Sequence, residues 1–382
     1  MTSIIRPLKP RDSHEPHRVA TPLELLFDLV SVIAIATAAA GLHHAIAEAH
    51  ATQGVISFVL AFFAIWWAWM NYTWFASAYD NDDTLFRLLT MVIMGGSLTM
   101  AAGIGAMFEH FDLTLVVIGY IIMRIGMVVL WLRAARHDTS RRATALTYAG
   151  GIAAVQVLWI VYVALLPMPP TFGYALFACG IVLELAVPVV AERKSATPWH
   201  RHHIIERYGL LNIIVLGETL LAGSFALQRV TTGFEWAYVH IALSALVIVF
   251  SMWWLYFARE EHLETTDLDR ALPWGYGHFV IFASGAAAGA GFAVLVDIIA
   301  HKAHVALIAG DFAVAIPVAV YLAGLWFVRD RFCLPLPARQ ILLVFAALIL
   351  AAPLTPMALE GIAALTVFAV MARNILIHRH GR

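Results

Sequence analysis

Long apolar stretches alternate with short polar segments along the whole chain. A bilayer core about 30 Å thick needs roughly 20 consecutive apolar residues in a helix, and twelve stretches come close to that length. They run near 22–42, 54–75, 85–108, 113–133, 143–166, 171–191, 204–226, 235–257, 274–299, 312–328, 340–354 and 357–377. The pattern therefore predicts an all-α, polytopic integral membrane protein with about twelve transmembrane helices.

The composition agrees with this pattern. Of the 382 residues, 62% are hydrophobic and only 13% are charged, which is more apolar surface than a soluble domain of this size can bury. The polar segments are too short for a catalytic or nucleic-acid-binding domain, and the sequence has no zincin, serine-hydrolase or Walker motif. We therefore expect no enzymatic activity, no cofactor and no nucleic-acid partner.

The Lys and Arg residues indicate the orientation, because cytoplasmic loops retain them. With the N-terminus inside, all but three of the 24 lie on the cytoplasmic side or at inner helix ends. The exceptions are Arg124, within a span, and Arg229 and Lys302, outside. Residues 1–20 are polar and lack the apolar core of a cleaved signal peptide. We expect a bacterial inner-membrane protein with both termini in the cytoplasm.

Two tryptophan pairs indicate an internal duplication. Trp66 and Trp67 match Trp253 and Trp254 at a constant offset of 187 residues, and two aspartates beyond each pair match at the same offset. The chain would then consist of two repeats of six spans each. Because six is an even number, both repeats have the same orientation in the membrane, and an axis along the membrane normal would relate them. The predicted organisation is a cytoplasmic tail (1–20), a first six-helix half (21–192), a basic His-rich cytoplasmic linker (193–203), a second six-helix half (204–378) and a cytoplasmic tail (379–382).

Three segments also resemble a known family. TPLELLFDLVSVIAIA begins at Thr21, HHIIERYGLLNIIVLGETLLA begins at His202, and WWLYF begins at Trp253. Together they are similar to the bacterial low temperature requirement protein A family, over nearly the whole chain. The resemblance implies a multi-spanning inner-membrane protein linked to growth in the cold, and it supplies neither a substrate nor a reaction.

Ionisable residues inside the predicted spans carry the strongest functional signal. A charge at the bilayer centre costs about 2.5–3.5 kcal/mol, so such residues normally have a partner. Glu218 lies about 14 residues after the start of its span. Arg124 lies about 11 residues after the start of a span that begins at the opposite face of the membrane, so the two residues lie at comparable depths. The two residues either pair, as a static strut or as a gated proton or ion site, or Glu218 is unpaired and protonated.

A second group of polar residues lies near the predicted inner helix ends. Glu24 and Asp28 are four residues apart and share a helix face, which Ser31 continues. Glu206 is the counterpart of Glu24 at the start of the seventh span. A structural role explains both residues, because the positive end of a helix dipole stabilises an acidic side chain in the first turn. The functional alternative is an acidic vestibule at the inner ends of these two spans.

The remaining candidates are Glu184, near the inner end of the sixth span, and the polar helpers Asn212 and His278. Glu184 can reach the headgroups by snorkelling, while Asn212 and His278 are groups that commonly bond neighbouring helices. Neither the 17 histidines nor the two cysteines show metal-ligand spacing, so we expect no metal site.

These residues predict a transporter or permeation pathway for a proton or a small solute, using the buried Glu and Arg side chains. The alternative is a non-transporting membrane factor that binds lipid or a protein partner in cold adaptation. Membrane lipids are partners in either case, and a homo-oligomer is compatible with both.

Overall fold

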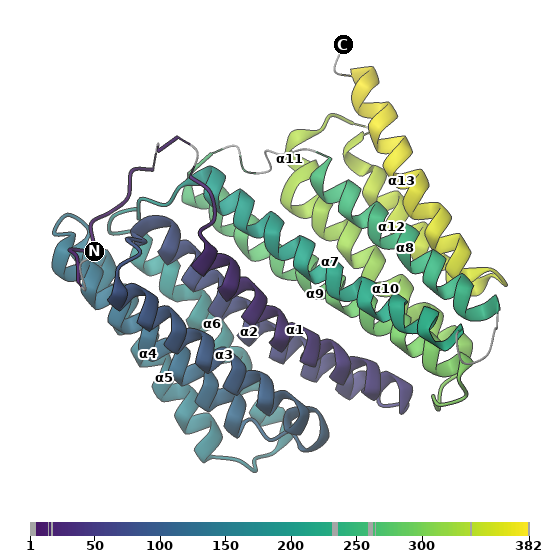
Figure 1. The fold of residues 1–382 in the computed structure, drawn as a ribbon, viewed down its shortest axis with the longest axis horizontal. Coiled ribbons are helices and arrows are strands. Elements are labelled where there is room, and N and C mark those ends of the chain that lie inside the picture. Colours follow the sequence, from purple (N-terminus) through teal and green to yellow (C-terminus); the bar gives the residue numbers. More distant parts are fainter. Residues whose placement is uncertain are drawn as a thin grey trace. The chain divides into compact units, whose positions relative to one another are not determined.

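A computed structural model describes residues 5–13, 15–16, 18–230, 236–258, 263, 265–336 and 338–380, and the regular elements in these ranges are all helical (Figure 1). The helices are α1 (Pro22–Ala47), α2 (Ala51–Tyr79), α3 (Thr84–His110), α4 (Thr114–His137), α5 (Arg142–Ala164), α6 (Pro170–Glu192), α7 (Arg201–Val230), α8 (Trp236–Phe257), α9 (Leu268–Ile299), α10 (Leu307–Leu325), α11 (Arg331–Cys333), α12 (Ile341–Ala351) and α13 (Ala358–His380). A π-helical turn, Trp326–Asp330, joins α10 to α11, and 3-10 turns flank α12. Position 235, where the eighth predicted span begins, and residues 381–382 of the predicted tail lie outside the described residues.

Ten of the described helical segments are long and apolar enough to cross a membrane. Helix α7 and the shorter apolar segment Ala338–Leu354 stand where the sequence predicts the seventh and eleventh spans. The chain is therefore a multi-pass membrane protein, as its hydropathy predicts.

Two compact units divide the chain. Unit 1 contains Met1–Ala34 and Ala64–Arg207, and unit 2 contains Ile35–Phe63 and Tyr208–Arg382. The division falls within α1, α2 and α7, so each of these helices contributes residues to both units. The halves predicted from the sequence, 21–192 and 204–378, are a different division and stay a prediction.

In unit 1, helices α3, α4, α5 and α6 follow one another, each packing on the next (Figure 1). Glycines bring α3 and α4 close together: a Cβ on Gly96 would lie 2.6 Å from the Gly119 carbonyl oxygen, and one on Gly103 would lie 2.7 Å from the Leu115 Cβ. Asp83 caps α3 by accepting the Phe86 N–H at 2.8 Å. The close contact of α3 and α4 thus depends on the absence of side chains at these glycines.

In unit 2, a buried ion cluster fixes the end of α8. Asp330 in the π-helical turn accepts hydrogen bonds from Arg329 Nε at 2.5 Å and from Arg373 Nε and Nη2 at 3.0 Å. Arg329 Nη1 also donates to the carbonyl oxygens of Leu255 and Tyr256, at 2.7 and 3.0 Å. The positive charge of Arg329 at these last carbonyl groups of α8 interacts favourably with the negative end of the helix dipole.

Candidate functional site

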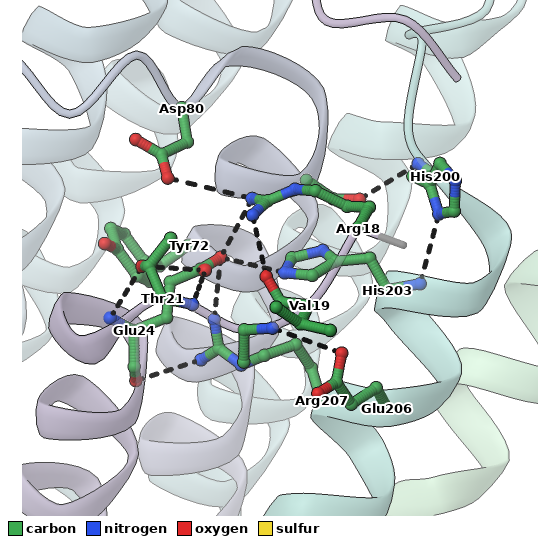
Figure 2. A network of polar contacts seen from close by, with 12 residues as sticks. Arg18, Val19, Thr21, Glu24, Tyr72, Asp80, His200, His203, Glu206 and Arg207 are labelled. Atoms are coloured by element: carbon green, nitrogen blue, oxygen red, sulfur yellow. Dashed lines mark hydrogen bonds and ion pairs between the residues drawn. The ribbon is translucent and has the colours of Figure 1, made fainter. Parts of the chain in front are cut away.

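The candidate site lies in unit 1, where the first turn of α1 faces the first two turns of α7 (Figure 2). Helix α1 begins at Pro22, after Thr21. The Thr21 N–H and hydroxyl donate to Glu24 Oε2 at 2.8 and 2.9 Å, and the Glu24 N–H donates to Thr21 Oγ1 at 3.3 Å. This reciprocal capping box uses one carboxylate oxygen of Glu24 to fix the helix start.

The other oxygen of Glu24 faces α7. Its Oε1 atom lies 3.0 Å from Arg207 Nη1, 3.1 Å from His203 Nε2 and 3.6 Å from Arg18 Nη2. His203 and Arg207 are four residues apart on α7, so they present both side chains on one helix face. Glu24, His203 and Arg207 are each 0% exposed, which makes these contacts a buried network and not a surface salt bridge.

Asp28 extends the network one turn further into α1. Its Oδ1 atom accepts hydrogen bonds from Arg207 Nη2 at 2.5 Å and from Trp69 Nε1 at 2.7 Å. Arg207 therefore bridges Glu24 and Asp28 with separate nitrogen atoms. The Oδ2 atom of Asp28 is buried and has no hydrogen-bond partner among the described residues.

The polar edge of the site comes from Arg18 and the end of α2. Arg18 Nη2 lies 3.7 Å from Asp80 Oδ2 (Figure 2). Burial, reinforced by the charge of Glu24, raises the pKa of Asp80 to about 6, although the Asp82 N–H and Arg18 favour the charged form. Burial also lowers the pKa of His200, whose Nε2 donates to the Glu15 carbonyl oxygen at 2.8 Å.

The formal charges of this network do not balance. Its buried carboxylates belong to Glu24, Asp28 and Asp80, and its buried guanidinium groups to Arg18 and Arg207. One negative charge therefore remains when His203 is neutral. Because an uncompensated buried charge is destabilising, the arrangement is chemically suited to take up one proton.

A second buried carboxylate of unit 1, Glu184 on α6, is surrounded by donors. Its oxygens accept hydrogen bonds from Trp67 Nε1 and the Tyr120 hydroxyl, both at 2.8 Å, and from Trp159 Nε1 at 3.2 Å. Arg124 Nη2 lies 3.7 Å from Glu184 and donates to the same Tyr120 hydroxyl. Arg124 and Glu184 are each 1% exposed. The structure thus gives Arg124 a partner on α6, where the sequence had offered Glu218.

Glu218, Asn212 and His278 belong to unit 2. Glu218 is partly exposed and lines a pocket of about 210 Å³. Asn212 Oδ1 accepts from the Tyr321 hydroxyl at 3.2 Å, and His278 Nδ1 donates to the Trp274 carbonyl oxygen at 2.8 Å. Each of these two predicted helpers thus makes one hydrogen bond within unit 2, while Asn212 Nδ2 and His278 Nε2 are buried without a hydrogen-bond partner among the described residues.

The last two predicted residues lie in unit 1. The Ser31 hydroxyl donates to the Phe27 carbonyl oxygen one turn earlier, at 2.9 Å. Glu206 accepts the Ala20 N–H at 3.1 Å and ties the segment before α1 to α7. Of the polar line predicted on α1, Glu24 and Asp28 meet α7, while Ser31 bonds its own helix. The described residues contain no group of three His, Cys, Asp or Glu placed to hold a metal ion.

Sequence reasoning missed Arg207 and His203 as site residues. The sequence pattern counts Arg207 only among the positive charges at inner helix ends, and it includes His203 in the basic linker 193–203. A usable signal was present: the spacing of His203 and Arg207 equals that of Glu24 and Asp28, and both pairs lie at the start of a helix. Each pair shares one face of its own helix, and the opposite chemical character of the two pairs made them candidates for a contact.

Comparisons with known proteins identify the family of this chain. No solved structure matches the chain. A relative from Rhizobium meliloti (strain 1021), described as "Uncharacterized protein RA0937", is 30% identical over 245 residues, which cover 61% of this chain and 57% of the relative. The family model for the bacterial low temperature requirement A protein matches residues 19–373, a range that contains both helix starts of the site. The chain belongs to the bacterial low temperature requirement A protein (LtrA) family.

Proposed function

We propose that this LtrA protein is a transporter or permeation pathway for a proton or a small solute, without enzymatic activity or a cofactor. The observation that carries the proposal is the unused Oδ2 atom of Asp28, buried in a network where carboxylates outnumber guanidinium groups. A proton can bind at that oxygen without displacing the hydrogen bonds that Trp69 and Arg207 make to Oδ1.

Proton binding would weaken the contact between the first turns of α1 and α7. Arg207 holds Glu24 and Asp28 together, because each of its terminal nitrogens faces one carboxylate. A neutral Asp28 attracts the guanidinium less strongly, so the ion pair with Glu24 becomes the main link. The two protonation states therefore favour two arrangements of these helix ends, which is what coupling proton binding to permeation requires.

The proposal includes a bacterial inner-membrane location with both termini in the cytoplasm. The distribution of Lys and Arg supports this orientation, and it would place the Glu24 network at the cytoplasmic side. We also propose about twelve spans in two six-helix repeats of one orientation. The repeat rests on sequence position alone, since Trp66 and Trp67 are buried whereas Trp253 and Trp254 are 46% and 54% exposed.

A second function is favoured by the exposed aromatic residues of α8. Phe250, Trp253 and Trp254 are all 46–55% exposed on one helix. A non-transporting membrane factor would use such a surface to bind lipid or a protein partner in cold adaptation. Membrane lipids are partners in both proposals, and a homo-oligomer is compatible with either.

Flux measurements in liposomes test the proposed transport. The purified full chain is reconstituted with an internal pH dye, and a potassium diffusion potential drives protons inward. Wild type is expected to acidify the lumen, and Asp28→Asn is expected to reduce the rate to that of protein-free liposomes. Asparagine keeps an acceptor for Trp69, so the variant removes the titrating group and retains a local hydrogen bond.

The matched control is Glu109→Gln, the same kind of charge removal at a side chain that is 67% exposed. Its flux should equal that of wild type. Equal flux in wild type and a folded Asp28→Asn variant would contradict the role of Asp28. Wild-type protein without proton flux, together with specific binding to lipid or to a protein partner, would favour the second function.

A further inference from the structure

Unit 2 contains a pocket of about 210 Å³ lined by the second half of α1, by α7 and by α9. Alanines of α1 and α9, with Gly289 and Leu221, form its apolar walls. The three remaining lining residues, His43, Glu218 and Thr219, carry polar groups. The pocket thus has a mostly apolar lining with a few polar groups, as small-molecule binding sites typically have.

Two of these polar groups already have partners. The Thr219 hydroxyl donates to the carbonyl oxygens of Gly285 and Val215, at 2.9 and 3.1 Å. His43 Nε2 lies 2.8 Å from Asp297 Oδ2, so a charge on His43 would be balanced by Asp297. Glu218 differs, because its carboxylate meets no hydrogen-bond or ion-pair partner in the part of the chain that the structure describes. A carboxyl group without a partner among the described residues therefore faces an apolar space.

We propose that this pocket binds a small primary ammonium ion with an apolar body, held by the Glu218 carboxylate. An ammonium group supplies the N–H donors that the carboxylate lacks, and such charge-assisted bonds are about twice as strong as neutral ones. The alanine and glycine walls would take the hydrocarbon part of the ligand. A divalent metal ion fits poorly, since calcium takes about six to eight oxygen ligands.

The pocket volume limits the size of the ligand. A dry protein cavity of about 150 Å³ admits a benzene ring. The pocket of about 210 Å³ therefore has room for one ring and a short aminomethyl arm. Benzylammonium has this size and charge, and benzyl alcohol is its neutral counterpart. This inference concerns equilibrium binding in unit 2 and does not depend on proton flux through the Glu24 network.

Calorimetric titration of the purified full chain in lipid nanodiscs tests the inference at neutral pH. Wild type is expected to bind benzylammonium at least about tenfold more tightly than benzyl alcohol, and Glu218→Gln should remove this preference. The control Glu109→Gln should bind both probes as wild type does, because Glu109 is an exposed residue of unit 1. Equal affinity of wild type for the two probes would overturn the proposal.

A second variant locates the bound probe. Ala40 is an exposed lining residue, so Ala40→Leu fills the pocket without disturbing a buried contact. It is expected to abolish binding of benzylammonium. Unchanged binding to Ala40→Leu would show that the probe sits elsewhere, and would refute the proposal even where Glu218→Gln fails to fold.

Discussion

Replacing Arg207 with methionine tests the energetics of the buried network directly. Arg207 is 0% exposed and touches Glu24 and Asp28, which are also 0% exposed. The variant Arg207→Met would keep a side chain of similar length and remove the charge between the two carboxylates. Both carboxylates would then be buried with much less compensation, and Glu24 would retain only His203 and the more distant Arg18.

Removing one partner of a buried ion pair destabilises a protein by about 3–5 kcal/mol, whereas replacing the whole pair with well-packed hydrophobic residues of similar volume is often neutral or stabilising. Arg207 serves two carboxylates, so we expect a loss at the upper end of that range. The triple variant Arg207→Met, Glu24→Gln, Asp28→Asn removes all three charges. It should recover most of the loss, since glutamine still completes the capping box and asparagine still accepts from Trp69.

Titration with SDS in mixed micelles gives the free energy of unfolding for each variant. The matched control is Arg87→Met, which breaks a salt bridge to Asp82 in which both side chains are 50% exposed. An exposed pair contributes about 0–1 kcal/mol, so this control should unfold almost as wild type does. The reasoning is refuted if Arg207→Met loses no more stability than Arg87→Met, or if the triple variant is less stable than Arg207→Met alone.

Three further predictions use the same unfolding titration. Glu184→Leu should lose about 3–5 kcal/mol by leaving Arg124 uncompensated, and the added change Arg124→Met should recover part of it; no recovery would argue against the ion pair. Gly119→Ala should lose about 1–3 kcal/mol because its Cβ meets the Met100 backbone, while Gly105→Ala, with open space around its Cβ, should be neutral or slightly stabilising; equal effects would contradict the close helix contact. Burial raises the pKa of Asp80 to about 6, so the folded state binds this proton more tightly than the unfolded state, and the contribution of Asp80 to stability falls as pH rises from about 4 to about 6. Asp80→Asn should flatten that slope, and an unchanged slope between those pH values would assign it to other groups.

The membrane spans were predictable because their signal is local. A run of apolar residues of bilayer length must form a helix whatever surrounds it, since lipid offers the backbone no hydrogen bonds. The start of α1 was predictable for a similar reason, because Thr21, Pro22 and Glu24 make a capping box without help from other helices. The family could also be inferred, because its motifs are contiguous segments of the sequence.

The partners of buried charges were harder to predict. Sequence position gives the depth of a residue in the membrane, but it does not give the rotation of its helix or the identity of the neighbouring helix. Arg124 and Glu218 have comparable predicted depths, yet Arg124 meets Glu184 together with the hydrogen-bond donors of Trp67 and Tyr120. In the sequence of a membrane protein, Trp and Tyr residues are usually interpreted as interfacial anchors. No local feature identifies them as hydrogen-bond donors to a buried carboxylate.

The two long family motifs, which begin at Thr21 and His202, supply the two sides of the buried network. Glu24 and Asp28 are acidic and four residues apart at the start of α1, and His203 and Arg207 are basic and four residues apart at the start of α7. If these residues only anchored helix ends, they would gain most by remaining exposed to water and headgroups, because burying an ion costs several kcal/mol. All four are instead 0% exposed, and Asp28 still keeps one oxygen without a donor among the described residues. A buried network that leaves this Asp28 oxygen without a donor fits the proposed proton binding better than it fits anchoring. Asp28→Asn separates the two explanations, since under the proposal it should abolish flux while leaving the Glu24 contacts of α7 in place.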